Sequence, residues 1–146
     1  MILTSLGFSG TQDGMSTKQK DGVWSVLQAF QPEEVHHGDC IGSDEDFHYL
    51  CRELVSRPDI HIHPPDNPSK RAFCEPVLKD FIHLEKPYMK RNDDIVADSH
   101  ALVATPKGEE VRRGSGTWAT IRRARKKGIP IYIIYPDGRF EQESWA

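Results

Sequence analysis

The feature that most constrains the fold is a set of three glycine-bearing turns, each lying between a strand-like run and a helix-like stretch. The turns comprise residues 7–11 (GFSGT), 37–44 (HGDCIGSD) and 113–117 (RGSGT). Small and hydroxyl side chains at such crossings let backbone amides approach an anion closely. In open α/β sheets these crossings lie at the carboxyl ends of the strands, where ligands bind. The three turns together favour an α/β domain that holds phosphate.

Strand-like and helix-like segments alternate along almost the whole chain. Strand-like runs cover residues 2–8, 34–37, 60–63, 100–104 and 129–135, and helical patterns lie within 16–30, 43–55, 84–99 and 117–127. This order predicts the α/β fold class. We expect a single Rossmann-like three-layer domain over residues 1–146, with a mostly parallel sheet of about five strands and helices on both faces. The tail after Pro136 is expected to form an edge hairpin.

Residues 64–87 interrupt the alternation. The segment contains five prolines among mixed polar residues, so it is too irregular for one long element and too long for an ordinary connection. Long loops of this kind are often functional. Arg71 lies in this segment, and it would cover a bound anion if the segment folded over the pocket. A solvated loop is the alternative interpretation.

Charge and hydropathy narrow the function further. The chain has 19 basic and 22 acidic residues, a net charge of -3 and a pI near 6.1, so it has no general attraction to nucleic acid or anionic membranes. No apolar run reaches the roughly 18 residues that a membrane span needs. We therefore expect a cytoplasmic protein without membrane contact. The three cysteines lack the spacing of a zinc knuckle or a disulfide framework, and no metal is assigned to them.

The turn at residues 113–117 carries the sharpest binding signal. Gly114 and Gly116 allow close backbone approach, while Ser115 and Thr117 offer hydroxyl groups to phosphate oxygens. The turn is not a Walker A motif, because the Gly-x-x-x-x-Gly-Lys-Ser/Thr pattern is absent. It is not a dinucleotide fingerprint either, since the third glycine is missing. The usual ATP and NAD assignments therefore do not apply.

The order of these motifs resembles that of the SLOG superfamily from residue 3 to about residue 135. The matching residues are Gly7-Phe8-Ser9-Gly10, the turn at 37–44, Arg91-Asn92, Gly114-Ser115-Gly116-Thr117, Ala124 and Ile129-Pro130-Ile131. That superfamily includes LONELY GUY phosphoribohydrolases, the DNA-processing protein A family and sensor domains for nucleotide-derived ligands. The resemblance implies a small stand-alone member with a Rossmann-like pocket for nucleotides or nucleotide sugars.

The candidate ligand-binding residues follow from the turns, from this resemblance and, for Arg71, from the proline-rich segment. They are Ser9, Gly10, Thr11, Gly38, Asp39, Gly42, Asp44, Arg71, Arg91, Asn92, Gly114, Ser115, Gly116 and Thr117. A guanidinium such as that of Arg91 grips phosphate bidentately, and an amide such as that of Asn92 reads ribose or base edges. The alternative for this pair is a solvated surface position.

Catalytic residues are not identified by the sequence. LONELY GUY enzymes resemble this chain around a Pro-Gly-Gly-x-Gly-Thr-x-x-Glu segment, but Arg112 and Arg113 replace its proline and first glycine, and Thr120 stands at the position of its glutamate. A threonine is no general acid or base near neutral pH. The weak candidates that remain are Asp39 and Asp44, with Asp66 as a third carboxylate. Turn formation by Asp39 and helix capping by Asp44 are the simpler roles.

Histidines and basic residues invite other interpretations. His61 and His63 share one face of a strand, but no third ligand recurs at a recognisable spacing, so no metal site is predicted. His37 flanks the second turn and is the histidine expected to touch the ligand. The basic run at residues 122–127 lies near the end of a helix, where positive charge complements the helix dipole.

The leading hypothesis is a protein that binds a nucleotide or nucleotide-derived small molecule as a sensor, carrier or sequestering protein. The first alternative is an enzyme that hydrolyses the N-glycosidic bond of a nucleotide or nucleotide sugar. The second is a nucleic-acid accessory module, which the composition does not favour. We expect no bound cofactor. A homo-oligomer is expected as well, because the chain has three tryptophans for a small core.

Overall fold

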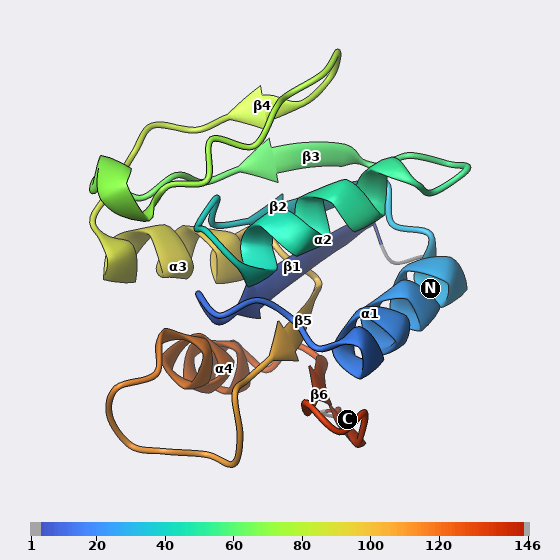
Figure 1. Ribbon diagram of the computed structural model, residues 1–146, viewed down its shortest axis with the longest axis vertical. Coiled ribbons are helices and arrows are strands. Elements are labelled where there is room, and N and C mark those ends of the chain that lie inside the picture. Colours follow the sequence, from blue (N-terminus) through green and yellow to red (C-terminus); the bar gives the residue numbers. More distant parts are fainter. Residues whose placement is uncertain (1–3, 145–146) are drawn as a thin grey trace.

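Strand β1 (Ser5–Gly10) lies in the middle of a seven-stranded sheet in the computed structural model, which describes residues 4–144 (Figure 1). The strand order is β4-β3-β2-β1-β5-β6-β7. The other strands are β2 (Glu34–His37), β3 (Asp59–Ile62), β4 (Phe81–Ile82), β5 (Ala101–Thr105), β6 (Ile131–Ile134) and β7 (Phe140–Glu143). All neighbouring pairs are parallel except β6 and β7. The predicted α/β, Rossmann-like fold class is confirmed.

Helices α1 (Thr17–Phe30) and α2 (Ser43–Arg52) cover one face of the sheet, and α3 (Tyr88–Ala97) and α4 (Gly116–Lys127) cover the other (Figure 1). One buried core joins α1 and α2 to β1, β2 and β3, and a second joins α4 to β5 and β6. A 3-10 turn, Pro68–Lys70, lies between β3 and β4. No helix within residues 4–144 is long and apolar enough to cross a membrane.

Local sequence signals set the ends of two helices. Ser16 and Gln19 form a reciprocal capping box at the start of α1, in which each side chain accepts from the other residue's backbone amide. Ser115 caps α4, and Gly128 ends it in the left-handed conformation at φ 80°. That conformation favours glycine because it crowds a Cβ. These caps fix where α4 begins, which matters for the site below.

The sheet has seven strands rather than about five. The tail forms β7, which pairs with β6 as the expected edge hairpin. Strand β4 arises inside the proline-rich segment and extends the opposite edge by pairing with β3. The first strand was expected at residues 2–8, and its residues 2 and 3 lie outside the described part of the chain. Of the tryptophans, Trp24 is half-buried and Trp118 is buried, and Trp145 also lies outside the described residues.

The chain reverses its direction of growth across the sheet next to β1. It first builds β2 and β3 outward on one side, and then returns past β4 and α3 to place β5 on the other side of β1. The carboxyl ends of β1 and β5 therefore diverge into helices on opposite faces. Ligands of open α/β sheets bind in the crevice at such a point.

Candidate functional site

A cleft of about 370 Å³ opens at the carboxyl ends of β1 and β5. Gly10 and Thr105, the last residues of the two strands, are register partners there. The residues that line the cleft are Gly10, Thr11, Gln12, Asp13, Tyr88, Lys107, Gly114, Ser115, Gly116 and Thr117. Two of the three glycine turns, the first and the third, therefore meet at one cavity. The sequence did not indicate Gln12, Asp13, Tyr88 or Lys107, which have no motif of their own.

The third turn presents the start of α4 to this cleft. Gly114 adopts φ 79°, and the Ser115 hydroxyl accepts a hydrogen bond from the Trp118 amide at 3.1 Å. The first turn of a helix leaves its amides without intrahelical acceptors, and here these are the amides of Gly116 and Thr117. Such amides, together with the helix dipole, attract an anion.

Gly116 permits a close contact between two helices at the edge of the cleft. A Cβ at this position would lie 2.1 Å from the Tyr88 hydroxyl oxygen, so only glycine allows the tyrosine to rest there. Burial raises the pKa of the Tyr88 phenol, so its hydroxyl stays protonated near neutral pH and remains a hydrogen-bond donor. The cleft thus combines backbone amides with the phenol ring of Tyr88.

Two buried hydroxyl groups beside Gly10 have no hydrogen-bond partner among the described residues. They are Ser43 Oγ and Thr105 Oγ1, and a Cβ built on Gly10 would lie 2.8 Å and 2.5 Å from them. The amide nitrogen of Asn92 is a third such atom. Buried polar groups nearly always have partners, in the protein or in bound molecules. Because Gly10 lines the cleft, the two hydroxyls beside it indicate that a bound polar molecule supplies their hydrogen-bond partner.

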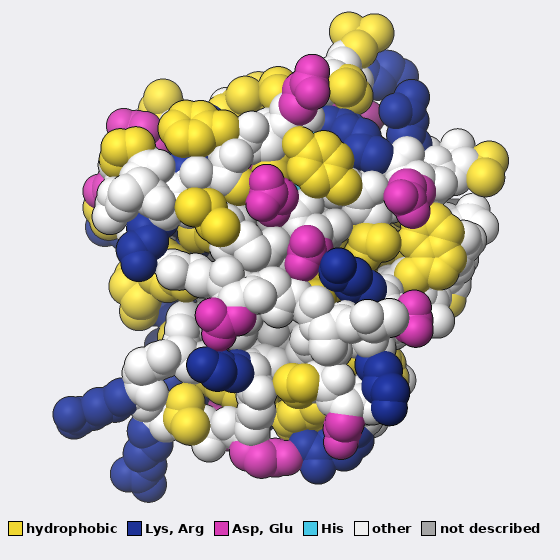
Figure 2. Space-filling model, in the orientation of Figure 1, with side chains coloured by type: hydrophobic (Ala, Val, Ile, Leu, Met, Phe, Trp, Pro, Cys, Tyr) yellow, Lys and Arg dark blue, Asp and Glu magenta, His cyan; other side chains and the backbone are white. Residues whose placement is uncertain are grey.

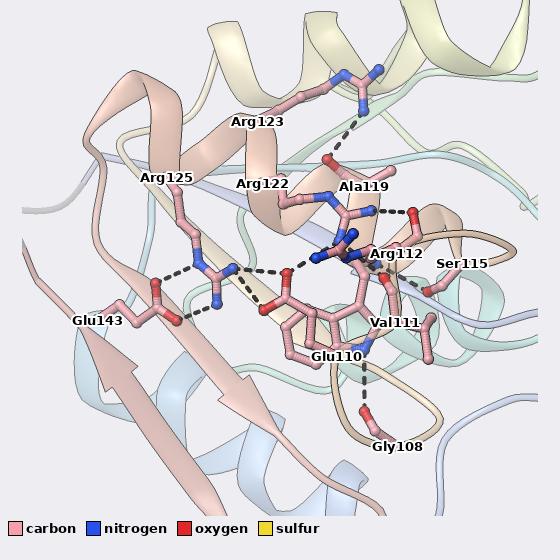
Figure 3. Close-up of polar contacts among 11 residues, drawn as sticks. Gly108, Glu110, Val111, Arg112, Ser115, Ala119, Arg122, Arg123, Arg125 and Glu143 are labelled. Carbon is pink, nitrogen blue, oxygen red and sulfur yellow. Dashed lines mark hydrogen bonds and ion pairs between the residues drawn. The ribbon is translucent and has the colours of Figure 1, made fainter.

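The loop between β5 and α4 is anchored to α4 by the basic run. Figure 3 shows Arg122 reaching Glu110 and the Val111 carbonyl, at 3.1 and 3.0 Å, and Arg125 reaching both Glu110 and Glu143. The Trp118 indole donates to the Gly108 carbonyl at 3.1 Å. These arginines hold the loop that carries the third turn. On the face seen in Figure 2, basic and acidic side chains are intermixed, which does not favour a polyanion surface.

The second turn packs behind the cleft instead of lining it. Gly42 adopts φ 100°, and a Cβ there would lie 2.3 Å from the Gln12 carbonyl oxygen. The Ser43 amide donates to the Thr11 carbonyl at 2.9 Å. Thus Gly42 and Ser43 pack against the backbone of Thr11 and Gln12, on the side away from the cleft. Ser9 is half-buried in β1, and it is not among the residues that line the cleft.

The polar groups of the second turn are engaged in internal contacts. Asp39 is fully buried and accepts hydrogen bonds from Arg71 Nε and the Cys74 amide, both at 2.9 Å. This ion pair closes the proline-rich segment over the turn. Asp44 is buried as well and accepts from the Cys40 amide at 3.1 Å. Arg71 thus folds over the second turn and not over the cleft, and the anion that it pairs with is the carboxylate of Asp39.

Arg91 occupies the centre of this internal network. Its side chain is buried, Nη1 donates to the carbonyl oxygens of Gly38 and His63, and Nε donates to Asn92 Oδ1. The guanidinium carbon lies 4.7 Å from the centre of the Tyr88 ring. Arg91 therefore ties α3 to the carboxyl ends of β2 and β3, and its contact with the cleft lining is the one with the Tyr88 ring.

The candidate acids differ in environment. Burial raises the pKa of Asp44 to about 6, and the nearby Arg91 charge opposes this rise. Asp66 is exposed in the proline-rich segment. Thr120 is buried, and its hydroxyl donates to the Gly116 carbonyl at 2.9 Å within α4. The position of the LONELY GUY glutamate thus holds a threonine that is bonded to its own helix.

His37 lies in an internal hydrogen-bond chain. The Asp39 amide donates to His37 Nδ1 at 3.0 Å, so His37 Nε2 carries the proton and donates to His48 Nδ1 at 2.9 Å. His48 Nε2 in turn lies 2.8 Å from the Glu75 carbonyl oxygen. Burial lowers the pKa of His37 well below its usual value, which keeps the ring neutral. The structure gives His37 a packing role behind the turn, away from the cleft lining.

Comparisons with known proteins bear on the fold. No protein-family model matches the chain, and a search of curated proteins finds no match. The structure is similar to that of the molybdenum cofactor binding protein from the phototrophic bacterium Rippkaea orientalis, with a TM-score of 0.67, 14% identity and coverage of 92% of this chain and 78% of that chain. It is also similar to TM1055, a structural genomics target, with a TM-score of 0.57, 14% identity and coverage of 88% and 72%. These likenesses place the chain among Rossmann-like α/β proteins.

Proposed function

We propose that this protein binds a phosphate-bearing, nucleotide-derived small molecule in the cleft between β1 and β5, and that it serves as a sensor, carrier or sequestering protein. The observation that carries the proposal is the meeting of the loop at residues 10–13 with the amino-terminal end of α4 at the point where the sheet reverses its growth. The volume of about 370 Å³ lies within the range of small-molecule sites, roughly 300 to 1,000 Å³.

Each part of the cleft suits one part of such a ligand. The amides at the start of α4 and the exposed ammonium of Lys107 suit phosphate oxygens. The ring of Tyr88 offers a surface for a heterocycle, and Asp13 and Gln12 suit ribose hydroxyls. We also propose that the chain is a member of the SLOG superfamily, on the motifs given above. The Rippkaea orientalis neighbour, described as a molybdenum cofactor binding protein, supports a bound small molecule at this kind of fold.

Thermal stabilisation across a ligand panel tests the proposal. The panel contains nucleoside mono-, di- and triphosphates, cyclic nucleotides, ADP-ribose and the molybdenum cofactor. A ligand at about 100 times its dissociation constant adds roughly 2.7 kcal/mol to the free energy of unfolding, which gives a clear rise in Tm. If no member of the panel at millimolar concentration raises the Tm, the proposal is wrong.

A pair of charge reversals locates the binding. Lys107→Glu reverses the exposed charge in the cleft, and Lys126→Glu makes the same change at the exposed, opposite end of α4. We expect the first variant to lose most of the ligand-induced rise in Tm and the second to keep it. Equal loss in both variants would indicate a general electrostatic effect rather than binding in the cleft.

A second candidate function is hydrolysis of an N-glycosidic bond. The carboxyl group with a raised pKa, Asp44, is buried in the second turn and is not among the residues that line the cleft. A carboxyl group with a pKa near 6 suits general acid or base catalysis. Incubation with the nucleotide panel, followed by chromatography of the released base, tests this function. Release of base that is lost in Asp44→Asn would support the enzyme. No release of base over many hours would contradict the enzyme and keep the binding function.

A homo-oligomer is a separate proposal, and sedimentation of the purified protein tests it.

A further inference from the structure

Four of the seven histidines gather on one face of the sheet, and they lie on or directly after strands β2, β3 and β4. His36 of β2 and His61 of β3 are register partners. His63 lies two residues beyond His61, and His83 follows β4. Side chains two residues apart on a strand point to the same face, so the four rings form one cluster. Figure 1 shows β4 alongside β3 at the edge of the sheet.

The four rings are joined by two nitrogen–nitrogen contacts and by ring stacking. His36 Nδ1 lies 2.8 Å from His63 Nε2, and His61 Nδ1 lies 2.9 Å from His83 Nε2. The rings of His63 and His83 stack with centroids 4.0 Å apart, and those of His36 and His61 stack at 4.5 Å. One nitrogen from each of His36, His61 and His83 lies within 4.8 Å of the other two.

A carboxylate orients two of these rings from the far side. Glu34 Oε1 lies 2.9 Å from His36 Nε2, and Oε2 lies 3.5 Å from His61 Nε2. With Nε2 of both rings directed at Glu34, their Nδ1 atoms face His63 and His83. A carboxylate bonded to the outer nitrogen of a histidine is the usual support of a metal-ligating imidazole. Asp98 lies beside His36 and His63 and offers an oxygen ligand within the same reach.

A second group of possible metal ligands, His37, His48 and Cys74, differs because its nitrogen atoms are already hydrogen-bonded. Its nitrogens are taken up by the Asp39 amide, by each other and by the Glu75 carbonyl, and all three residues are buried. In the four-histidine cluster the imidazoles are bonded mainly to one another, and His61 and His83 are partly exposed. An ion can therefore enter from solvent and replace contacts between imidazoles.

The donor atoms of the cluster suit a transition metal. The four histidines offer imidazole nitrogens, and Asp98 offers a carboxylate oxygen. A neutral imidazole carries the lone pair that binds a transition metal, whereas the imidazolium ion does not. Nitrogen ligands select zinc and related divalent ions over calcium and magnesium.

We propose that the four-histidine cluster is a structural site for one divalent transition-metal ion of the zinc class, bound by His36, His61 and His83, with Glu34 as the orienting carboxylate. His63 and Asp98 complete its surroundings. Strand β4 is two residues long and lies at the edge of the sheet, within the irregular segment of residues 64–87. The ion joins His83 of this segment to β2 and β3, so it fastens the segment to the sheet. The sequence did not indicate this site because His83 stands at no recognisable spacing from the pair on β3.

Metal titration of the full chain, prepared without a polyhistidine tag, tests the site. Isothermal titration with Zn²⁺, Co²⁺ and Ni²⁺ is expected to give one ion per chain, and the Co²⁺ complex to show visible bands of nitrogen ligation. His61→Gln and His83→Gln are each expected to weaken binding by at least about 100-fold, because each removes a ligand. His100→Gln is the matched control, since His100 is exposed and outside the cluster, and it should bind as the wild type does.

A second measurement separates loss of the site from loss of the fold. Both partly exposed histidines are replaced singly, and the circular dichroism and urea unfolding of each metal-free variant are compared with those of the metal-free wild type. Zn²⁺ is expected to raise the Tm of the wild type and to protect residues 64–87 from proteolysis, and to do neither in a folded His83→Gln variant. The proposal is overturned if no tested ion binds at 100 µM, or if His61→Gln and His83→Gln bind like the control.

Discussion

The second and third glycine turns, residues 37–44 and 113–117, both contain two glycines and a serine but differ in their surroundings. Both follow a buried strand, and both precede a helix that covers the sheet. The second turn is largely filled by its own side chains and by Arg91 and Arg71, which leave only the Ser43 hydroxyl of its buried side-chain groups without a partner among the described residues. The third turn has small residues, faces a cleft and leaves helix amides unpaired. A glycine turn of this kind faces a cleft only where side chains from elsewhere in the fold do not bond its polar groups.

The difference has a simple origin in side-chain size and charge. Asp39 and Asp44 bring negative charge into the second turn, and burial of a carboxylate requires a donor nearby. Arg71 and Arg91 supply donors from distant parts of the chain. Gly114 and Ser115 bring no charge into the third turn, and its Arg113 is exposed. Arg122 and Arg125 of α4 pair with Glu110 and Glu143. The third turn therefore keeps room for an anion.

The largest effect is expected for Arg91→Ala. The substitution leaves the Gly38 and His63 carbonyls without their donor and removes the charge that faces buried Asp44. We expect a loss of about 4 kcal/mol in the free energy of unfolding, measured by urea denaturation. Arg112→Ala, at an exposed position of the cleft loop, should change it by less than about 0.5 kcal/mol. If the Arg91→Ala variant has normal stability but no longer binds ligand, the binding site lies at the second turn and not at the third.

The next effect is a pH dependence that belongs to the second turn. The pKa of Asp44 is about 6 in the folded protein and 3.8 in the reference state, so between pH 4 and pH 6 the folded state binds more protons than the unfolded state. Stability from this group is therefore greatest in acid and falls as the pH rises through 6. A shift of about two pKa units corresponds to up to about 3 kcal/mol.

Urea unfolding of the wild type and Asp44→Asn across pH 4 to 8 measures this effect. The asparagine keeps an oxygen for the Cys40 amide and has no charge to bury. We expect the stability of the variant, relative to the wild type, to rise between pH 4 and 6 and to stay constant above pH 7. A difference in stability that does not change with pH would mean that Asp44 has the same pKa in the folded and the unfolded protein.

The sequence was sufficient for the architecture because the architecture depends on periodicity. Each alternating or apolar run longer than three residues became a strand, and the tail hairpin formed as expected. Strand β4 was missed because two residues between prolines contain no period. Its pairing depends on Asp80, which accepts from the Ile60 amide at 2.9 Å and from Arg52. Such a contact across the fold leaves no local pattern.

The candidate site was predictable in part, for the same reason. The sequence singled out Gly10, Thr11 and residues 114–117 as small or hydroxyl residues, and these residues line the cleft. Lys107 and Tyr88 were missed because a lysine in a loop and a tyrosine at the start of a helix carry no signal until the fold brings them together. The sequence also placed Asp39 and Arg91 at the ligand, since it could not show that Arg71, Gly38 and His63 already engage them.

A smaller effect is expected at the two unpartnered hydroxyls between the turns. Ser43→Ala and Thr105→Val remove buried polar atoms that have no partner among the described residues. Because an unsatisfied buried hydroxyl costs free energy, each ligand-free variant should be as stable as the wild type or more stable by about 1 kcal/mol. The bound state should be weaker by roughly tenfold if the hydroxyls help to complete the site. Denaturation without ligand, and titration with the best ligand of the panel, measure the two quantities separately.

The two outcomes have different meanings for the comparison. If the variants are more stable but bind ligand more weakly, Ser43 at the start of α2 belongs to the binding cleft. A clear loss of stability in both variants would show that the hydroxyls are satisfied in the free protein by bound water, and the cleft would then end at Gly10. Ser25→Ala on α1 is the matched control, because its hydroxyl donates to the Asp21 carbonyl within the helix and lies away from the cleft.

The smallest expected effects concern the exposed charges at the mouth of the cleft, Lys107 and Asp13, which lie 3.3 Å apart and are largely exposed to solvent. Such a pair contributes little to stability, so neither Lys107→Gln nor Asp13→Asn should change the free energy of unfolding by more than about 0.5 kcal/mol. Their effects on an anionic ligand should have opposite signs. At low salt Lys107→Gln should weaken binding by about threefold and Asp13→Asn should strengthen it by about as much, and both changes should shrink above 0.5 M salt because the charges are screened. Titrations at two salt concentrations measure this, and changes of the same sign in the two variants would mean that the ligand's charge does not face the third turn.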